Sequence, residues 1–224
     1  MGLLQPELWP VGFAEEDTSA ETIRSYLDDS CEPRFYNPLD DPSATARLEG
    51  LRGEWANGQQ SVVFTSGVFD VFHGNHRAYL LAAKLNTVPY HYRRFDETSD
   101  NPWEALSPEQ RKDYTDYAIG ARVIKQVVSI DGDAGVAARK SFDPTKANMQ
   151  RPIYGWVSRA RDVVSASIMR HGETHPLVDA VTIHDPEQQE LAGTPHSSIL
   201  NIGRFIRPDV WIMPFWKPLN KEIP

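Results

Sequence analysis

The sequence predicts a three-layer α/β fold with a mainly parallel sheet, and two observations lead to this prediction. Short apolar runs with strand character recur at residues 62–64, 123–130, 178–183 and 210–213. Between several of these runs, apolar residues follow helical spacing. Strands that alternate with helices form βαβ units, whose right-handed crossovers place the strands parallel to one another. The pattern is therefore typical of a Rossmann-like fold.

Residues 1–46 are expected to form an N-terminal helical extension to this fold. A short helix is predicted over 20–27, and a turn-rich stretch follows it. Apolar residues with helical spacing predict a second helix over 44–55, which the dipeptide Asn57-Gly58 ends. Residues 47–224 then form the main domain.

Two further helices are predicted in the second half of the chain. Apolar residues at 157–168 form one helical face, and those at 199–206 form another. Thr194-Pro195 is a typical start for the second of these helices and Arg207-Pro208 a typical end. Proline fits the first turn of a helix but cannot continue one.

The most informative stretch is 62–84, where the apolar run Val62–Phe64 leads through Ser66-Gly67 into a helix opened by His73 and His76. The first N–H groups of a helix lack partners within it, and the helix dipole favours negative charge there. Two imidazoles at this spacing lie on one helical face and add donors aimed in the same direction. Ligands of parallel sheets bind at the carboxyl ends of strands, where this turn is expected. The stretch therefore predicts a phosphate site that suits a nucleoside triphosphate.

The same residues resemble a known family. From Gly67 to Leu80 the motif Gly-x-Phe-Asp-x-x-His-x-x-His-x-x-x-Leu is similar to the N-terminal signature of the cytidylyltransferase-like nucleotidyltransferases. The likeness is greatest to the members that act on glycerol 3-phosphate and on heptose 1-phosphate. The family pattern His-x-Gly-His reads His-Gly-Asn-His over 73–76, with the glycine one position early. The resemblance covers about residues 47–218.

The resemblance implies that His73 and His76 are catalytic and donate hydrogen bonds to the α- and β-phosphates. Nucleotidyl transfer depends on positioning and on neutralising phosphate charge more than on covalent help from the protein. A competing interpretation of two nearby histidines is a zinc site of a hydrolase, with His91 as the third ligand. No cysteine or carboxylate falls at ligand spacing, so this alternative is weaker and no metal ligand from the protein is expected.

Five residues before the histidines are expected to bind the nucleotide: Thr65, Ser66, Gly67, Phe69 and Asp70. The first three are expected to form the turn that meets the phosphates. Asp70 is expected to cap the helix, to hold His73 in one tautomer or to help place Mg²⁺, and a purely structural cap is equally open.

Two later segments are expected to supply positive charge. Asp133, followed by Arg139 and Lys140, resembles the strand end and short basic helix of the family, so the basic pair is expected to clamp a phosphate. Residues 151–153 and Arg159 resemble an Arg-Pro segment and the arginine that contacts phosphate or acceptor. These three basic residues are the remaining catalytic candidates, and Asp133 is a further nucleotide-binding one. The alternative for each basic residue is that it lies on the surface and has no role in binding or catalysis.

The chain also departs from the family. Residues 86–120 are polar, aromatic and turn-rich, with a helix expected from Ser107, where the family leads almost directly into its next strand. We expect an insertion there, either a lid or acceptor-binding loop or a solvated surface excursion. Residues 213–216 replace the family's Lys/Met-Gly-x-Asp, and the Ser/Thr-Thr helix start that follows it is missing before Pro224. The alternative function is therefore a non-catalytic nucleotide-binding protein, or a fragment that lacks this C-terminal motif.

Composition limits the partners and the compartment. A net charge of −8 argues against a general nucleic-acid-binding protein, which needs a basic excess. The single cysteine, Cys31, fits a reducing cytosol. The N-terminus lacks the pattern of a signal peptide, and no run approaches the roughly 20 apolar residues of a membrane span. A cytoplasmic protein with no membrane partner is expected.

The expected activity is that of a nucleotidyltransferase. It moves CMP, or as the second choice AMP, from CTP or ATP to a small phosphorylated alcohol or sugar and releases pyrophosphate, with Mg²⁺ as cofactor. Homodimers are usual in the family, so a homodimer is one expected assembly. The acceptor does not follow from the sequence, because acceptor pockets are built from variable loops.

Overall fold

The computed structural model describes residues 35–36, 43–140, 152–170, 172–184 and 197–213, and only the backbone at 138–140 and 197–201. The strands of its main sheet are β1 (Phe35–Tyr36), β2 (Ser61–Gly67), β3 (Ile124–Asp131), β6 (Ala180–His184) and β7 (Val210–Ile212). They lie in the order β1-β6-β3-β2-β7, and neighbouring strands pair in parallel. The predicted α/β fold with a mainly parallel sheet is confirmed.

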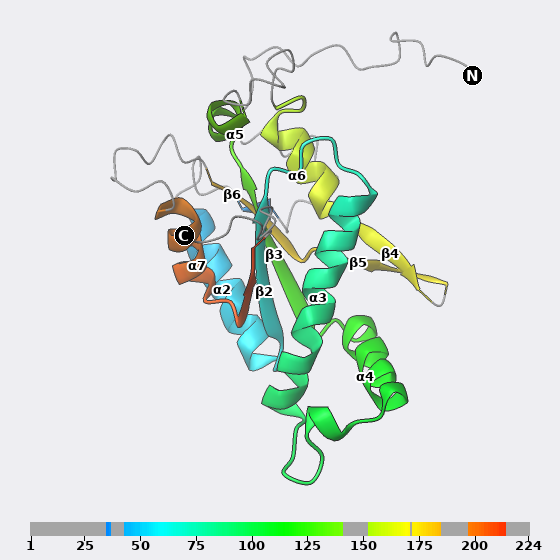
Figure 1. The fold of residues 1–224 in the computed structure, drawn as a ribbon. Helices are drawn as coiled ribbons and strands as arrows, with labels where there is room; N and C mark the ends of the chain where they lie inside the picture. The colour runs from blue at the N-terminus through cyan, green and yellow to red at the C-terminus, as the bar shows by residue number, and fades with distance from the viewer. Residues whose placement is uncertain (1–34, 37–42, 141–151, 171, 185–196, 214–224) are drawn as a thin grey trace, which may run out of the picture.

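Helices cover both faces of this sheet (Figure 1). They are α2 (Ser43–Asn57), α3 (Gly74–Phe95), the 3-10 helix η3 (Trp103–Ala105), α4 (Pro108–Gly120), α5 (Asp133–Lys140), α6 (Trp156–Val164) and α7 (Ser197–Ile206). Val62 and Phe64 pack toward α2 and α7, whereas Val63, between them, packs toward α3 and α4. Successive strand residues point to opposite faces, so both faces of β2 are buried and its apolar run is continuous.

The strand order has a switch point next to β2. Along the chain, β2, β3 and β6 are added in one direction, and β7 then pairs with the free edge of β2. At such a switch point the connections from two neighbouring strands run in opposite directions and leave a crevice at the carboxyl ends of these strands. Ligands of parallel sheets bind in this crevice. This crevice lies between β2 and β7.

The N-terminal part contributes more to the sheet than the sequence predicted. The pairing of Phe35 with Val181 makes β1 an edge strand beside β6. The predicted helix over 44–55 is observed as α2, and the expected boundary at residue 47 falls inside it. The predicted helix over 20–27 lies outside the described residues.

Helix α3 is longer than its apolar pattern indicated. It runs on to Phe95 with Pro89 inside it, through residues expected to lie in an irregular insertion. Three of its buried positions carry polar side chains: Lys84 binds Asp179 at 2.9 Å, Thr87 donates to the Ala83 carbonyl and His91 bonds Ser61 at 3.0 Å. These residues interrupt the apolar period. Thr87 is satisfied within its own helix, whereas Lys84 and His91 need partners from distant segments to be buried.

The rest of the segment 86–120 lies far from the histidines. Helix α4 begins after Ser107, as predicted, because the Ser107 hydroxyl and the Gln110 side chain form a capping box. A helix the length of α3, 22 residues, spans about 33 Å, so residues after 95 start at the end opposite His73. Figure 1 shows α4 beside that end. This placement argues against a lid or acceptor-binding loop over the histidine turn and favours the surface excursion.

Two boundaries in the second half differ from the prediction. Helix α6 ends at Val164, and Ile168, expected on its apolar face, belongs to the antiparallel hairpin β4 (Ser167–Arg170) and β5 (Glu173–Pro176). Helix α7 ends at Ile206, directly before the predicted stop. The expected start at 194–195 lies outside the described residues.

Candidate functional site

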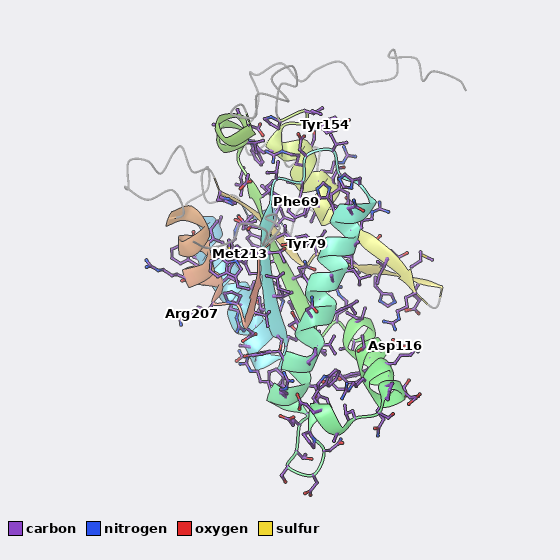
Figure 2. The ribbon with its side chains drawn as sticks, in the orientation of Figure 1. Phe69, Tyr79, Asp116, Tyr154, Arg207 and Met213 are labelled. Atoms are coloured by element: carbon purple, nitrogen blue, oxygen red, sulfur yellow. The ribbon has the colours of Figure 1, made fainter. Side chains whose placement is uncertain are left out.

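The turn that connects β2 with α3 lies at the switch point. It covers residues 68–73 and follows the carboxyl end of β2, whose neighbour is β7. The Tyr79 hydroxyl donates to the carbonyl of Ile212 at 3.1 Å and so ties the first turns of α3 to the end of β7. Figure 2 labels Tyr79 on α3, with Phe69 at the preceding turn and Met213 after β7. Both histidines therefore lie at the edge of the sheet that the sequence predicted.

His73 and His76 form a capping box at the N-terminus of α3. The Asn75 amide donates to His73 Nδ1 at 3.2 Å, and the His73 amide donates to His76 Nδ1 at 3.3 Å. The two ring centroids are 4.1 Å apart. An imidazole that accepts at Nδ1 in its neutral form carries its proton on Nε2. Both rings thus keep an Nε2–H donor, and they lie side by side at the start of the helix.

The histidines differ in their surroundings. His73 is exposed, whereas His76 is half-buried and stacks on the Phe72 ring at 5.5 Å. Burial lowers the pKa of His76, the neighbouring His73 lowers it further, and Asp70 opposes the shift. His76 is therefore a neutral hydrogen-bond donor near pH 7, which suits contact with a phosphate oxygen without a proton transfer.

Thr65, Ser66 and Gly67 are strand residues, which corrects the expectation that they form the turn. All three pair in register with β3, and the Thr65 and Ser66 side chains are buried. A Cβ atom on Gly67 would lie 3.0 Å from Cε2 of the Phe69 ring. Phe69 is itself buried and packs against His76 at 5.4 Å. Gly67 thus leaves room for the Phe69 ring, and that ring packs against His76. The turn that can meet a ligand is 68–73.

Asp70 holds two loops together and does not cap α3, since His73 occupies that position. Its carboxylate is buried and accepts the amide of Ile153 at 3.0 and 3.1 Å and the amide of Tyr154 at 3.2 Å. The histidine turn is therefore fixed to the segment that precedes α6. Tyr154 is labelled in Figure 2 near the start of α6.

Arg159 is fully buried, which corrects its expected role as a phosphate contact. It donates to four acceptors: the carbonyl oxygens of Tyr154 (3.1 Å), Val68 (2.6 Å) and Asp131 (2.7 Å), and the Asp133 carboxylate (2.6 Å). These acceptors come from the ends of β2 and β3 and from the loop before α6. Arg159 thus positions three loops around the site, and Asp133 is engaged with it.

The remaining basic candidates are only partly described. Arg139 and Lys140 lie in the last turn of α5, after the carboxyl end of β3, and their side chains are outside the described residues. His91 is 15 positions beyond His76 on α3, a distance of about 22 Å along the helix, so it cannot complete a zinc site with the pair. Within the described residues, no group of three or more metal-ligating side chains comes together.

A polar cluster at the same edge of the sheet was not predicted. His184 Nε2 lies 2.6 Å from Asp131 Oδ1, and its Nδ1 lies 2.7 Å from Ser129 Oγ. All three side chains are buried. Asp131 and His184 face each other in the register of β3 and β6, at the last residue of each strand. A signal was present, because polar residues that end adjacent parallel strands meet at one edge, but the strand register was needed to pair them.

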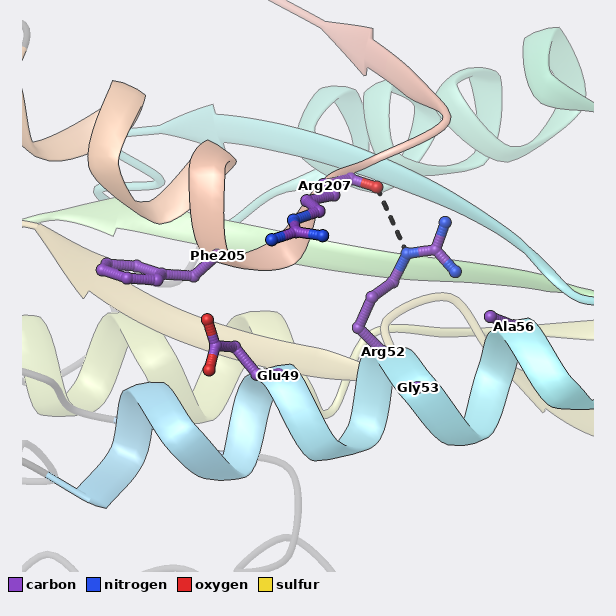
Figure 3. A pocket seen from close by; sticks show the side chains of 6 residues that line it. All are labelled: Glu49, Arg52, Gly53, Ala56, Phe205 and Arg207. Carbon is purple, nitrogen blue, oxygen red and sulfur yellow. Dashed lines mark hydrogen bonds between the residues drawn. The ribbon is translucent and has the colours of Figure 1, made fainter.

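The described surface also has a shallow cleft between α2 and α7 (Figure 3). Its volume is about 430 Å³, and it is lined by Glu49, Arg52, Gly53, Ala56, Phe205 and Arg207. Arg52 Nε donates to the Arg207 carbonyl at 3.2 Å, and Arg52 also pairs with Asp209. Both acceptors precede β7, at the amino ends of the strands. The cleft is therefore not part of the histidine site.

A scan against protein-family models returns no match, and a search of curated proteins returns none either. The likeness to the cytidylyltransferase-like family thus rests on the motif residues alone. Among the described residues, no helix has the length and apolar character needed to cross a bilayer.

Proposed function

We propose that this chain is a nucleotidyltransferase that moves CMP, or as the second choice AMP, from a nucleoside triphosphate to a phosphorylated alcohol or sugar. The observation that carries the proposal is the capping box of His73 and His76, in which both rings accept at Nδ1 and so keep Nε2–H as a donor at a helix N-terminus. Its place beside the switch point between β2 and β7 is the place where parallel sheets bind nucleotides. The choice of cytidine rests on the resemblance of the motif from Gly67 to Leu80.

In the proposed reaction an oxygen of the acceptor phosphate attacks the α-phosphorus of the triphosphate. A new P–O bond forms there, the bond from the α-phosphorus to the bridging β-oxygen breaks, and pyrophosphate leaves with the electron pair. His73 and His76 donate to phosphate oxygens on which negative charge accumulates, and the dipole of α3 adds to this stabilisation. Neither imidazole has to move a proton.

Three carboxylates at this edge of the sheet are the candidate ligands of a magnesium ion: those of Asp70, Asp131 and Asp133. Asp70 accepts two backbone amides, Asp131 pairs with His184 and Asp133 pairs with Arg159. Since each is engaged, these residues do not build a magnesium site of their own. We therefore assign no step to the metal, which would enter this site as the counter-ion of the triphosphate.

Calorimetry with CTP, ATP, GTP and UTP in the presence of Mg²⁺ tests nucleotide binding, and pyrophosphate release with a panel of phosphorylated acceptors tests transfer. His76→Ala is expected to lower turnover by roughly 10²–10³-fold, the usual effect of losing one preorganised donor. The matched control is His175→Ala, which removes an imidazole from the β4–β5 hairpin. An unchanged rate in His76→Ala contradicts the proposal.

A second candidate is a nucleotide-binding protein without catalysis. The burial of Arg159 favours it, because a cation expected at the phosphates is used instead to hold the loops. Nucleotide binding that needs His73 and His76, without pyrophosphate release for any acceptor, would support this second candidate.

A further inference from the structure

Three apolar residues form a rim beside the histidine pair. Val71 is 40% exposed and Ile153 is 50% exposed, whereas Phe72 is half-buried. Phe72 stacks on His76 with an angle of 24° between the rings. Val71 and Phe72 directly precede His73, so whatever binds the Nε2–H donors lies next to this rim.

The backbone at Val71 is strained without an evident packing reason. Its φ is 53°, in the left-handed region that β-branched residues rarely adopt. Phe69 has a similar φ of 52°, but its ring is buried beneath the histidines and the packing offsets the strain. The Val71 side chain is 40% exposed, so burial offsets less of the strain at this residue than at Phe69. Strain kept at a site in this way points to a role in binding.

Asp70 holds both parts of the rim in place. Asp70 directly precedes Val71 in the chain, and its carboxylate accepts the Ile153 amide at 3.0 and 3.1 Å. Ile153 lies on the segment that leads into α6, and α6 packs against β3 and β6. The rim therefore extends from the histidine turn away from β7. A nucleotide in the crevice between β2 and β7 leaves the rim free for the second substrate.

We propose that the acceptor carries an apolar organic group next to its phosphate, and that Val71, Phe72 and Ile153 bind that group. This inference rests on the proposed function and specifies its substrate class. The phosphate of an alkyl or aryl phosphate lies beside the triphosphate that the histidines bind, and its carbon chain lies on the rim. A bare polyol phosphate leaves three apolar side chains in water and gains nothing from them.

The test compares two acceptors of opposite character, hexyl phosphate and glycerol 3-phosphate. Their affinities are measured by calorimetry on the chain loaded with α,β-methylene CTP, which blocks transfer at the α-phosphorus. Hexyl phosphate is expected to bind at least tenfold more tightly. Val71→Asn and Ile153→Ser are each expected to weaken hexyl phosphate by about tenfold and to leave glycerol 3-phosphate and the CTP analogue unchanged.

Val71→Asn separates binding from folding. Asparagine tolerates the left-handed region, so the thermal midpoint of this variant is expected to stay the same or to rise. Met169→Ser is the matched control, because Met169 is 70% exposed on the β4–β5 hairpin away from the rim.

Equal affinities for the two acceptors, or variants that bind hexyl phosphate as tightly as the natural chain, overturn the inference and leave the proposed function intact. A Val71→Asn chain that is less stable and loses both acceptors alike shows a structural role and also overturns it. Failure of the natural chain to bind any CTP analogue overturns the proposed function instead.

Discussion

Replacing Arg159 by methionine tests whether this residue positions the site or contacts phosphate. Methionine has a similar length but no hydrogen-bond donor. The substitution therefore removes all four hydrogen bonds of the guanidinium. Three of them go to the backbone carbonyls of Val68, Asp131 and Tyr154, and the fourth goes to the Asp133 carboxylate. Because Arg159 is fully buried, the loss cannot be made good by water without opening the loops.

The magnitude follows from the four acceptors. Each carbonyl left without a donor costs about 1–3 kcal/mol when it stays buried. The Asp133 side chain is 41% exposed, so water can hydrate it and its loss adds little. The three carbonyls together give about 3–9 kcal/mol, and relaxation of the loops lowers this sum. We expect a loss of about 3–5 kcal/mol in the free energy of unfolding, and a fall of about 6–20 °C in the midpoint for a chain of this size.

Urea denaturation followed by circular dichroism measures the loss. Arg161→Met, an exposed arginine on the same helix, is the matched control and should stay within about 0.5 kcal/mol of the natural chain. If the methionine variant does not fold, Arg159→Lys keeps the charge and part of the bonding, and it should lose less. A methionine variant that keeps its stability but no longer binds CTP would refute the reasoning and restore Arg159 as a phosphate contact.

Three further predictions concern the turn itself. Gly67→Ala places a Cβ atom 3.0 Å from the Phe69 ring, so we expect a loss of about 1–2 kcal/mol in thermal denaturation; an unchanged midpoint would mean that the ring moves aside freely. His73→Asn keeps an N-cap side chain but not the Nε2–H donor, whereas His73→Ala loses both. Alanine should therefore cost about 1 kcal/mol more stability than asparagine while both lose turnover, and full activity in the asparagine variant would show that His73 serves only as a cap. Burial lowers the pKa of His76 in the folded chain below its usual 6.5. Between the folded and the unfolded pKa of this residue, the unfolded chain therefore binds more protons than the folded one. The free energy of unfolding should thus decrease as the pH falls from about 7.5 to about 5.5, and His76→Gln should make this decrease smaller; an identical slope in the variant would contradict it. Denaturation at both pH values measures the slope, to which His91, whose pKa burial also lowers, contributes in the same sense.

The helices and strands whose apolar residues follow a single regular pattern were predictable from the sequence. The run at 62–64 is a strand because both faces of β2 are covered, and a β-strand buried on both sides shows no alternation. The α2 pattern was equally readable, since its buried residues Ala44, Leu48 and Trp55 face a single layer. Where the period was broken, prediction failed. Buried Lys84 and His91 made half of α3 look like a polar surface segment, and their partners Asp179 and Ser61 are distant in sequence.

For the candidate site, the sequence by itself determined the local part. A strand, a short turn and a helix that begins at His73 are contiguous, so their geometry follows from neighbouring residues and from the needs of a helix N-terminus. The spacing of His73 and His76 alone placed both rings on one face. Their donor direction depends on a capping box within four residues, which is also local.

Only the tertiary structure decided which charged residues are buried and which are exposed. Arg159 and a surface arginine have the same appearance in a sequence, but Arg159 is fully buried and donates to carbonyl oxygens at the ends of β2 and β3. Asp131 and His184 meet because β3 and β6 pair in one register, although the two residues are 53 positions apart in the chain. Burial and pairing across strands are set by contacts between segments far apart in the chain, and no local period encodes them.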